Sequence, residues 1–399
     1  MKKGYNGRTL ETGLKHLNKS KINPDNKKTI EAFVTSLSAE GITQDRQCKY
    51  IYTLVQISKR VNNKDFSKLT KTDIEKLIGK LNNEDLSEWT KRDYRIVTRR
   101  LIKYIKIKEG ETFKKNEYPQ IVSWLSSSIK KADKRKYNKE ILKPEDIKLL
   151  AEGTFNLRDK AFILFLYESG ARIGEVMNIR LKDFKPAEAW ADVTLFGKTG
   201  ERTIAVISSA PAINNWINHH PTKNDIESFL FCSLNRSTMG KQPGYWYFNK
   251  LLREAKKRVD LKKPVNPHHF RHSRATALAK KFKEAELCNY MGWEIGSKEA
   301  ADYVHISTNE TNNKYKAMHG LISEEDEKDT FSPIECPNCG IMNDPSAKRC
   351  MGCGQFLDEE SLARYKVNQQ LLKKITNPDE LEDIIGDVMF KKLKEHGLI

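Results

Sequence analysis

Residues 265–305 contain the stretch that decides the fold, beginning Val-Asn-Pro-His-His-Phe-Arg-His and ending Ala-Asp-Tyr-Val-His. Asn266 can cap a helix, and the proline after it suits the first helical position. His268 and Arg271 then lie three residues apart on one face of that helix. Tyr303 follows in a second helical pattern. These side chains could bind and attack a phosphate, or they could belong to a basic surface helix with an ordinary core tyrosine.

The composition favours a nucleic-acid partner. The chain has 399 residues, a length typical of two or three domains, and a formal net charge of +18. Such an excess suits a polyanion, although solubility without such a partner is the alternative. The longest apolar run, Ala161 to Tyr167, is far shorter than the ~20 residues of a membrane span. The N-terminus lacks the apolar segment of a signal peptide, so we expect a cytoplasmic protein with no membrane partner.

Residues 26–125 are predicted to form a helical domain, and residues 1–25 a loose, basic N-terminal arm. Four helical patterns separated by short turns run from Asn26 to Lys106. Helix-capping residues at the start of these patterns support the prediction. The number and spacing of the patterns indicate a small helical bundle.

The fourth pattern follows Ser87 and carries different residues on its two faces. One face holds Tyr94, Val97, Leu101 and Tyr104, which we expect to pack in the bundle core. The opposite face carries four cations and no acid, namely Arg92, Arg95, Arg99 and Lys103. This row is either a solvated surface or, as we favour, a contact to the phosphate backbone of DNA.

A basic linker over residues 126–141 is expected to precede a second domain over residues 142–320. The apolar pattern from Asp159 to Glu168 predicts a buried helix that the following Ser-Gly ends. Arg172 begins a new helix, with Glu175 one turn on. The arginine could reach out from the edge of the core, or it could form a local surface pair with Glu175.

Two β-rich runs between Trp190 and Ile207 flank the sequence Gly-Lys-Thr-Gly, which predicts a hairpin. Lys198 lies at its tip, either as a mobile surface lysine or as a side chain that reaches toward a ligand. The sequence is not a phosphate-binding P-loop, because the upstream glycine is missing and a strand follows where a helix should. The second domain is therefore predicted to be mixed α+β with a small antiparallel sheet.

Four of the seven cysteines form two Cys-x-x-Cys pairs in a small module over residues 335–357. Two such pairs can supply four thiolates to a tetrahedral Zn²⁺, here from Cys336, Cys339, Cys350 and Cys353. Four ligands leave no open position, so we expect a structural zinc ribbon that needs its metal to fold. An acidic linker over residues 321–334 precedes it and amphipathic helices over residues 358–399 follow. The predicted fold class is multidomain and mainly α.

The second domain contains the side chains that metal-free phosphoryl transfer needs. Two guanidiniums can bind the phosphate oxygens, and a tyrosine can attack phosphorus. A lysine can protonate the departing oxygen, and a histidine can assist the nucleophile's proton. An indole adds an N–H donor. The candidates, in chain order, are Arg172, Lys198, His268, Arg271, Trp293 and Tyr303.

This domain resembles the catalytic domain of the tyrosine recombinases, the phage integrase family. Residues 26–106 resemble the helical core-binding domain of the same family, so the resemblance covers roughly residues 26–318. The motifs that carry it are Ser-Gly-Ala-Arg172-Ile-Gly-Glu175, Pro-His268-His-Phe-Arg271-His272, and Met-Gly-Trp293 followed by Tyr303-Val-His305.

The resemblance implies a role for each matching residue. Tyr303 is the nucleophile, and Arg172 and Arg271 bind the phosphate. Lys198 is the general acid, and His268 is the acid/base residue. Each of these roles is an expectation that the resemblance transfers to the matching position.

Glu175 matches a supporting acidic position, and Trp293 stands where many members have a second histidine. The interval from Trp293 to Tyr303 is slightly longer than usual for the family. The C-terminal zinc ribbon is not general in the family and resembles an extension of some archaeal integrases.

The resemblance also implies the reaction and the partners. The expected function is a site-specific DNA recombinase, or integrase, that cleaves and rejoins double-stranded DNA through a 3′-phosphotyrosine, for integration, excision or resolution of DNA elements. No catalytic metal and no ATP are expected. The free protein would be a monomer or weak oligomer, and a homotetramer would form on paired DNA sites. The alternatives are a DNA relaxase similar to type IB topoisomerases and a non-catalytic DNA-binding regulator with a zinc ribbon.

Overall fold

The computed structural model describes residues 9–128, 141–197, 200–301, 303, 315–316, 318–321 and 331–376. The chain divides into two compact units, one made chiefly of residues 1–141 and one chiefly of residues 142–399. Each unit has its own hydrophobic core. Within the described ranges, no helix is long and apolar enough to cross a membrane.

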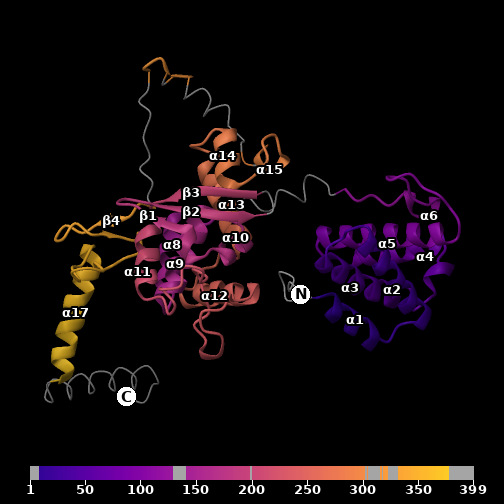
Figure 1. Cartoon of the computed structure of the whole chain (residues 1–399), viewed down its shortest axis with the longest axis horizontal. Helices are drawn as coiled ribbons and strands as arrows, with labels where there is room; N and C mark the ends of the chain where they lie inside the picture. The colour runs from indigo at the N-terminus through magenta and orange to yellow at the C-terminus, as the bar shows by residue number, and fades with distance from the viewer. Residues whose placement is uncertain are drawn as a thin grey trace, which may run out of the picture. The chain divides into compact units, whose positions relative to one another are not determined.

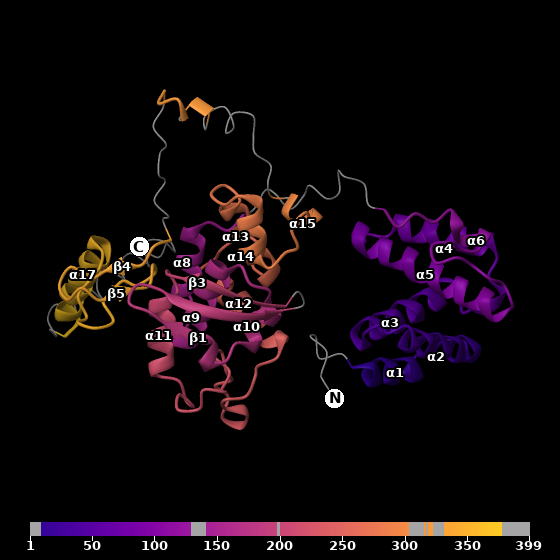
Figure 2. The same ribbon diagram turned by 45° about the horizontal axis from the view of Figure 1, so that its top comes forward.

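The first unit is a helical bundle, as predicted (Figure 2). A single buried cluster joins its helices and includes Phe33, Leu54, Leu77 and Leu101. Thr70 and Asp73 form the capping box that opens the third predicted helix. The helices are α1 (Leu10–Lys19), α2 (Pro24–Ala39), α3 (Gln44–Arg60), α4 (Lys71–Asn83), α5 (Glu88–Lys108) and α6 (Gln120–Ser123), with a 3₁₀ turn at Phe66–Lys68.

The prediction of a loose arm over residues 1–25 is wrong for its described part, because residues 10–19 form helix α1. Thr9 and Thr12 cap each other's backbone N–H groups at its start. Leu17 is fully buried in the bundle core. The apolar residues of this segment are few, but they recur at helical spacing, and this weak signal outweighs the high lysine content.

Helix α5 buries the face that its pattern predicts. Tyr94, Val97 and Leu101 are buried, and Tyr104 packs against the same core while partly exposed. Ser87 caps the helix by accepting a hydrogen bond from the backbone N–H of Thr90.

The second unit combines helices with a three-stranded antiparallel sheet (Figure 1). The predicted hairpin is present, and a short first strand pairs with it at the edge of the sheet. Helix α14 packs on β3, and α10 packs on β2. The strands are β1 (Phe184–Pro186), β2 (Ala191–Gly197) and β3 (Gly200–Val206). The helices are α8 (Pro144–Glu152), α9 (Leu157–Ser169), α10 (Ile173–Asn178), α11 (Ala210–Asn218), α12 (Tyr245–Arg258), α13 (Pro267–Leu278), α14 (Glu284–Met291) and α15 (Lys298–Ala301).

Helix α9 is the centre of this unit. Its residues from Ala161 to Ser169 are all buried, and α8, α11 and α13 pack around it. Gly170 ends the helix in the left-handed region at φ 54°. A side chain at this position would meet Met291 and Arg274. The glycine therefore permits both the chain reversal and the close approach of α13 and α14.

The C-terminal module packs on the second unit through Phe331. This ring is fully buried against Tyr167 of α9, with 5.0 Å between the ring centroids. The module contains the two-stranded sheet β4 (Ile334–Glu335) and β5 (Met342–Asn343), and helix α17 (Glu359–Thr376) follows. Most of both predicted linkers, the residue Lys198 and the last predicted helix lie outside the described residues.

Candidate active site

Helix α13 positions Arg271 at the centre of the candidate site. The side chain of Asn266 caps this helix and accepts a hydrogen bond of 3.0 Å from the N–H of His269. Arg271, one turn further, is buried. Its guanidinium donates to the carbonyls of Gly170 (2.8 Å) and Met291 (2.7 Å). One side chain thus joins the ends of α9 and α14 to α13, and its position is fixed before any ligand arrives.

Arg172 lies beside it and is held by a buried carboxylate. Its Nη1 donates to Oε1 of Glu175 at 3.0 Å and to the carbonyl of Gly292 at 3.2 Å. Arg172 remains one-third exposed, whereas the Glu175 side chain is only 2% exposed. This pair is therefore not the local surface pair that the sequence left open, since its acidic partner belongs to the interior.

A further cation, Arg202 of β3, completes this arrangement. It donates to Oε2 of Glu175 at 2.8 Å and to the carbonyl of Tyr290 at 3.0 Å. Its guanidinium also occupies the space beside Gly292 that a Cβ would need. Glu175 therefore ties the hairpin to the loop that carries Trp293. Sequence reasoning missed Arg202, because nothing local distinguishes it from other strand arginines.

The electrostatics of these residues favour an anion. Burial, followed by the positive charge of Arg172, lowers the pKa of Arg271 to about 10. Burial alone would raise the pKa of Glu175, but hydrogen bonds and charge from Arg202 and Arg172 bring it below its ordinary value. Three guanidiniums, those of Arg172, Arg202 and Arg271, share the one buried counter-charge of Glu175 and leave an excess of positive charge. A phosphate between them would relieve it.

Trp293 and Tyr303 lie next to this cationic centre. Their rings stack with 5.3 Å between centroids and 14° between planes. The Arg271 guanidinium carbon is 5.2 Å from the centroid of the Trp293 ring. The structure thus brings five of the expected residues into one connected set, comprising Arg172, Glu175, Arg271, Trp293 and Tyr303.

The histidines are arranged differently from the expectation. The hydroxyl of Tyr303 is 2.7 Å from Nδ1 of His272, a residue that the sequence singled out only as part of a motif. His268 is exposed, and among the described residues nothing forms a hydrogen bond with it. Partial desolvation and the charge of Arg271 lower the pKa of His268, while Glu299 opposes this shift. Helical spacing could have indicated His272, since it lies four residues after His268 and therefore on the same face of α13.

The four cysteines form one cluster in the C-terminal module. Their sulfur atoms all lie within 4.8 Å of one another. The Cys336–Cys353 and Cys339–Cys350 sulfur pairs are 3.6 and 3.5 Å apart. Four sulfurs at ~2.3 Å around one tetrahedral ion would be ~3.8 Å apart, so the cluster has the size of a metal site.

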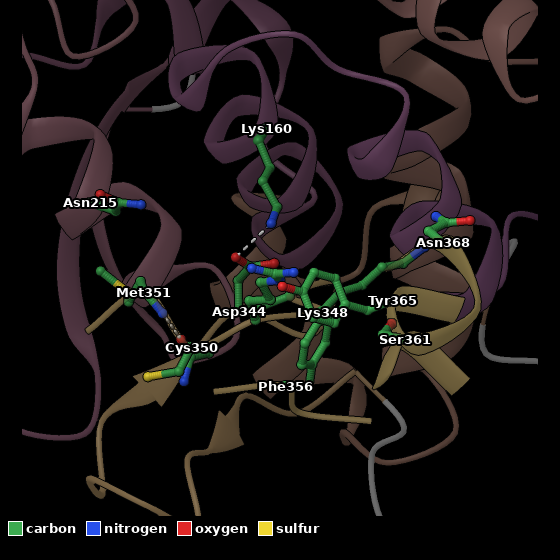
Figure 3. Close-up of a pocket in the computed structure, with 13 residues that line it drawn as sticks. Lys160, Asn215, Asp344, Lys348, Cys350, Met351, Phe356, Ser361, Tyr365 and Asn368 are labelled. Carbon is green, nitrogen blue, oxygen red and sulfur yellow. Dashed lines mark hydrogen bonds and ion pairs between the residues drawn. The ribbon is translucent and has the colours of Figure 1, made fainter. Parts of the chain in front are cut away.

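Charged side chains attach this module to the second unit in addition to Phe331, and Figure 3 shows one such contact, between Lys160 and Asp344. Lys160 of α9 pairs with Asp344 at 2.9 Å, and Glu152 of α8 pairs with Lys348 at 2.7 Å. Lys160, Asp344 and Lys348 line a pocket of about 610 Å³ together with Asn215 of α11. The cysteine module therefore packs against the helices around α9 and is not an isolated appendage.

The predicted cation row on α5 is partly covered by the segment that follows the helix. Arg92 donates to the carbonyl of Ser127 at 2.7 Å, and Lys103 donates to that of Lys114 at 2.7 Å. Arg99 stacks on Tyr118 at 3.9 Å. All four predicted cations, Arg92, Arg95, Arg99 and Lys103, are intermediate in exposure. They are more ordered than a freely solvated face would be.

Comparison with known proteins agrees with this geometry. The chain is 25% identical over 202 residues to Transposase A from transposon Tn554 of Staphylococcus aureus. This alignment covers 48% of the chain and 51% of that protein. It is also 25% identical over 170 residues to the tyrosine recombinase XerD of Halalkalibacterium halodurans. That alignment covers 41% of the chain and 55% of XerD. The chain thus spans about half the length of these curated relatives, all of them bacterial.

Solved structures show the same fold. XerH site-specific recombinase, bound to a palindromic difH substrate, aligns with a TM-score of 0.55 at 16% identity, over 78% of this chain and 94% of that one. A lambda integrase dimer bound to a COC′ core site aligns with a TM-score of 0.53 at 13% identity, over 69% and 94%. The architecture is that of a tyrosine recombinase. Residues 140–310 match the model of the phage integrase family.

Proposed function

We propose that this chain is a site-specific DNA recombinase that cleaves and rejoins DNA through a 3′-phosphotyrosine at Tyr303. The observation that carries the proposal is the position of the tyrosine. Its ring stacks on Trp293, whose other neighbour is the buried guanidinium of Arg271. A nucleophile beside a preformed anion site is what attack on a phosphodiester requires.

Arg172 and Arg271 would bind the non-bridging oxygens of the scissile phosphate and stabilise the charge that develops on them. Glu175 holds Arg172 in place, and Trp293 supports the phosphate and the tyrosine ring. Lys198 would donate a proton to the leaving oxygen. The resemblance implies an acid/base role for His268, which is exposed on α13.

The chemistry balances without a nucleotide cofactor. The Tyr303 oxygen forms a bond to phosphorus, and the bond to the 5′ oxygen breaks. The tyrosine proton passes to a base, and the leaving oxygen receives a proton from the general acid, which yields a free 5′-hydroxyl. A 5′-hydroxyl from the partner duplex then attacks the phosphotyrosine. Its proton returns to the general acid, and the tyrosine oxygen leaves with the proton held by the base, which regenerates the enzyme. The covalent bond conserves the energy of the phosphodiester, so no ATP is needed.

Assembly and DNA contact extend the same proposal. Two solved relatives are DNA-bound recombinases, and another is a lambda integrase tetramer bound to a Holliday junction, with a TM-score of 0.50. We infer a homotetramer on paired double-stranded sites and a monomer or weak oligomer in free solution. The α5 row of Arg92, Arg95, Arg99 and Lys103 would contact the phosphate backbone of the core site.

The cysteine cluster would hold one structural zinc ion. The donor set is four thiolates, which zinc prefers in closed tetrahedral sites. Bound zinc would supply only cross-linking of the two knuckles, because four protein ligands leave no position for substrate. Lys160 and Glu152 would then anchor the folded ribbon to the second unit through the two ion pairs described above.

Strand exchange between two duplexes tests the function. Duplexes bound by the protein are first selected from a pool with a randomised central segment. Pairs of differently labelled selected duplexes are then incubated with wild-type protein and with Tyr303→Phe. We expect joint molecules carrying both labels with the wild type and none with the variant. Relaxation of supercoiled plasmid without any exchanged product would favour the topoisomerase-like alternative, and binding without either reaction would favour the regulator.

A further inference from the structure

The environment of the Tyr303 hydroxyl contains a base that the family motifs do not assign. His272 of α13 places Nδ1 2.7 Å from this oxygen, within the range for proton transfer between heavy atoms. The two rings lie at a centroid distance of 5.1 Å. His268, the expected acid/base residue, is exposed and forms no hydrogen bond with the described residues.

We propose that His272 is the general base that accepts the proton of Tyr303 when the tyrosine attacks DNA, an inference that rests on the proposed recombinase function. In this step the Tyr303 oxygen forms its bond to phosphorus while its proton moves to Nδ1. The bond from phosphorus to the 5′ oxygen breaks, and that oxygen takes a proton from Lys198. In the rejoining step the 5′-hydroxyl gives its proton back to Lys198 as its oxygen attacks phosphorus, the bond from phosphorus to the Tyr303 oxygen breaks, and His272 returns its proton to that oxygen.

The other ring nitrogen supports a chemical role. Nε2 of His272 is buried and has no hydrogen-bond partner among the described residues. An unpaired buried nitrogen is uncommon and needs an explanation, and a proton-accepting role for the ring supplies one. The proposal assigns the resting proton of the neutral ring to Nε2, which leaves the lone pair of Nδ1 directed at the tyrosine.

The surroundings keep this base neutral near pH 7. Burial, followed by the charges of His269 and His268 on the same helix, lowers the pKa of His272. Tyr303 faces it from the segment after α15. From α9 and α14, which also pack on α13, Glu168 and Tyr290 approach this helix at Arg274. The carboxylate of Glu168 caps α11, and the hydroxyl of Tyr290 lies near the Glu168 carbonyl rather than at the His272 ring.

The matched variants are His272→Ala, which removes the base, and His272→Asn, which keeps an acceptor oxygen near the position of Nδ1 but has no basicity. The control is His219→Asn, an exposed histidine at the end of α11. The rate of covalent adduct formation is measured at saturating concentrations of a selected duplex. We expect both His272 variants to lose about 100-fold or more of the rate, and the control to match the wild type.

A substrate with sulfur in place of the bridging 5′ oxygen separates base from acid. A thiolate leaves without protonation, so this substrate should restore cleavage to Lys198→Ala but not to His272→Ala. Added imidazole should restore cleavage to His272→Ala, which also shows that the variant is folded. The rate of the wild-type protein should decrease as the pH is lowered below the pKa of His272, because a protonated ring cannot accept a proton.

The outcomes distinguish the two levels of the proposal. A wild-type rate in His272→Asn, or rescue of His272→Ala by the sulfur substrate, would overturn the assignment of the base while leaving the recombinase intact. Absence of any adduct with the wild-type protein would overturn the proposed function and this inference with it. Loss of rate in both variants, with DNA affinity unchanged and imidazole rescue, supports the base.

Discussion

Replacing Glu175 by alanine is expected to destabilise the second unit and disorder its anion site. This carboxylate accepts hydrogen bonds from the Arg202 guanidinium (2.8 Å), the Arg172 guanidinium (3.0 Å) and the Arg172 backbone N–H (3.0 Å). The substitution would leave Arg202, whose side chain is 9% exposed, as a buried charge without its counter-ion. It would also free Arg172 from the position in which it can meet a phosphate.

The magnitude follows from burial. Removing one partner of a buried ion pair costs about 3–5 kcal/mol. Arg172 is one-third exposed, so solvent screens its interaction with Glu175. Loss of the buried Arg202 interaction therefore accounts for most of the lost stability. We therefore expect the lower end, about 3 kcal/mol. For a unit of this size, that corresponds to a fall in Tm of about 6–12 °C.

Calorimetry of the full chain provides the assay, with Glu227→Gln as the matched control. Glu227 also contacts two cations, Lys182 and Arg180, but its side chain is 52% exposed, so its loss should cost less than about 1 kcal/mol. The pKa of Glu175 is lowered in the folded state, so its contribution exists above its unfolded pKa. The gap between wild type and variant should narrow as pH falls through the folded pKa. Equal losses in Glu175→Ala and Glu227→Gln would refute the reasoning.

Two further predictions concern the other parts of the chain. Lys103→Ala should weaken DNA binding to a similar extent for all DNA sequences and reduce the slope of log affinity against log salt concentration by about 1. Filter binding at several salt concentrations measures this slope. An unchanged slope would show that Lys103 does not contact DNA. Purified protein should contain one zinc ion per chain, and Cys336→Ser should lose it together with protection of residues 331–376 from protease; a metal-free protein with a protected module would contradict the structural zinc.

Much of the first unit could be predicted from local sequence, because its helices carry strong caps and regular apolar spacing. Ser87 and Thr70 mark helix starts that the structure confirms. Helix α1 was missed, since the burial of Leu17 depends on helices that lie further along the chain. The cations of α5 were identified as a row, but their contacts with Ser127 and Tyr118 come from a segment without any periodic signal.

The candidate site was predictable in its residue types and not in its contacts. The motifs singled out Arg172, Arg271 and Tyr303; in the structure Arg172 lies near Arg271, and Trp293 lies between Arg271 and Tyr303. They could not indicate Arg202 or the pairing of His272 with the tyrosine, because these contacts depend on the distance between β3, α13 and the segment after α15. A short β-hairpin and a loop set those distances, and neither produces a recognisable sequence pattern at Arg202 or His272.

The most direct test of the central claim is identification of the bond between protein and DNA. Wild-type protein is incubated with a selected duplex that carries a nick, denatured and digested with protease and nuclease, and the peptides are analysed by mass spectrometry. We predict a nucleotide linked through its 3′ phosphate to the peptide containing Tyr303, together with a released 5′-hydroxyl end that polynucleotide kinase can label directly. A nucleotide linked to any other residue, or a 5′-phosphate at the released end, would contradict the account.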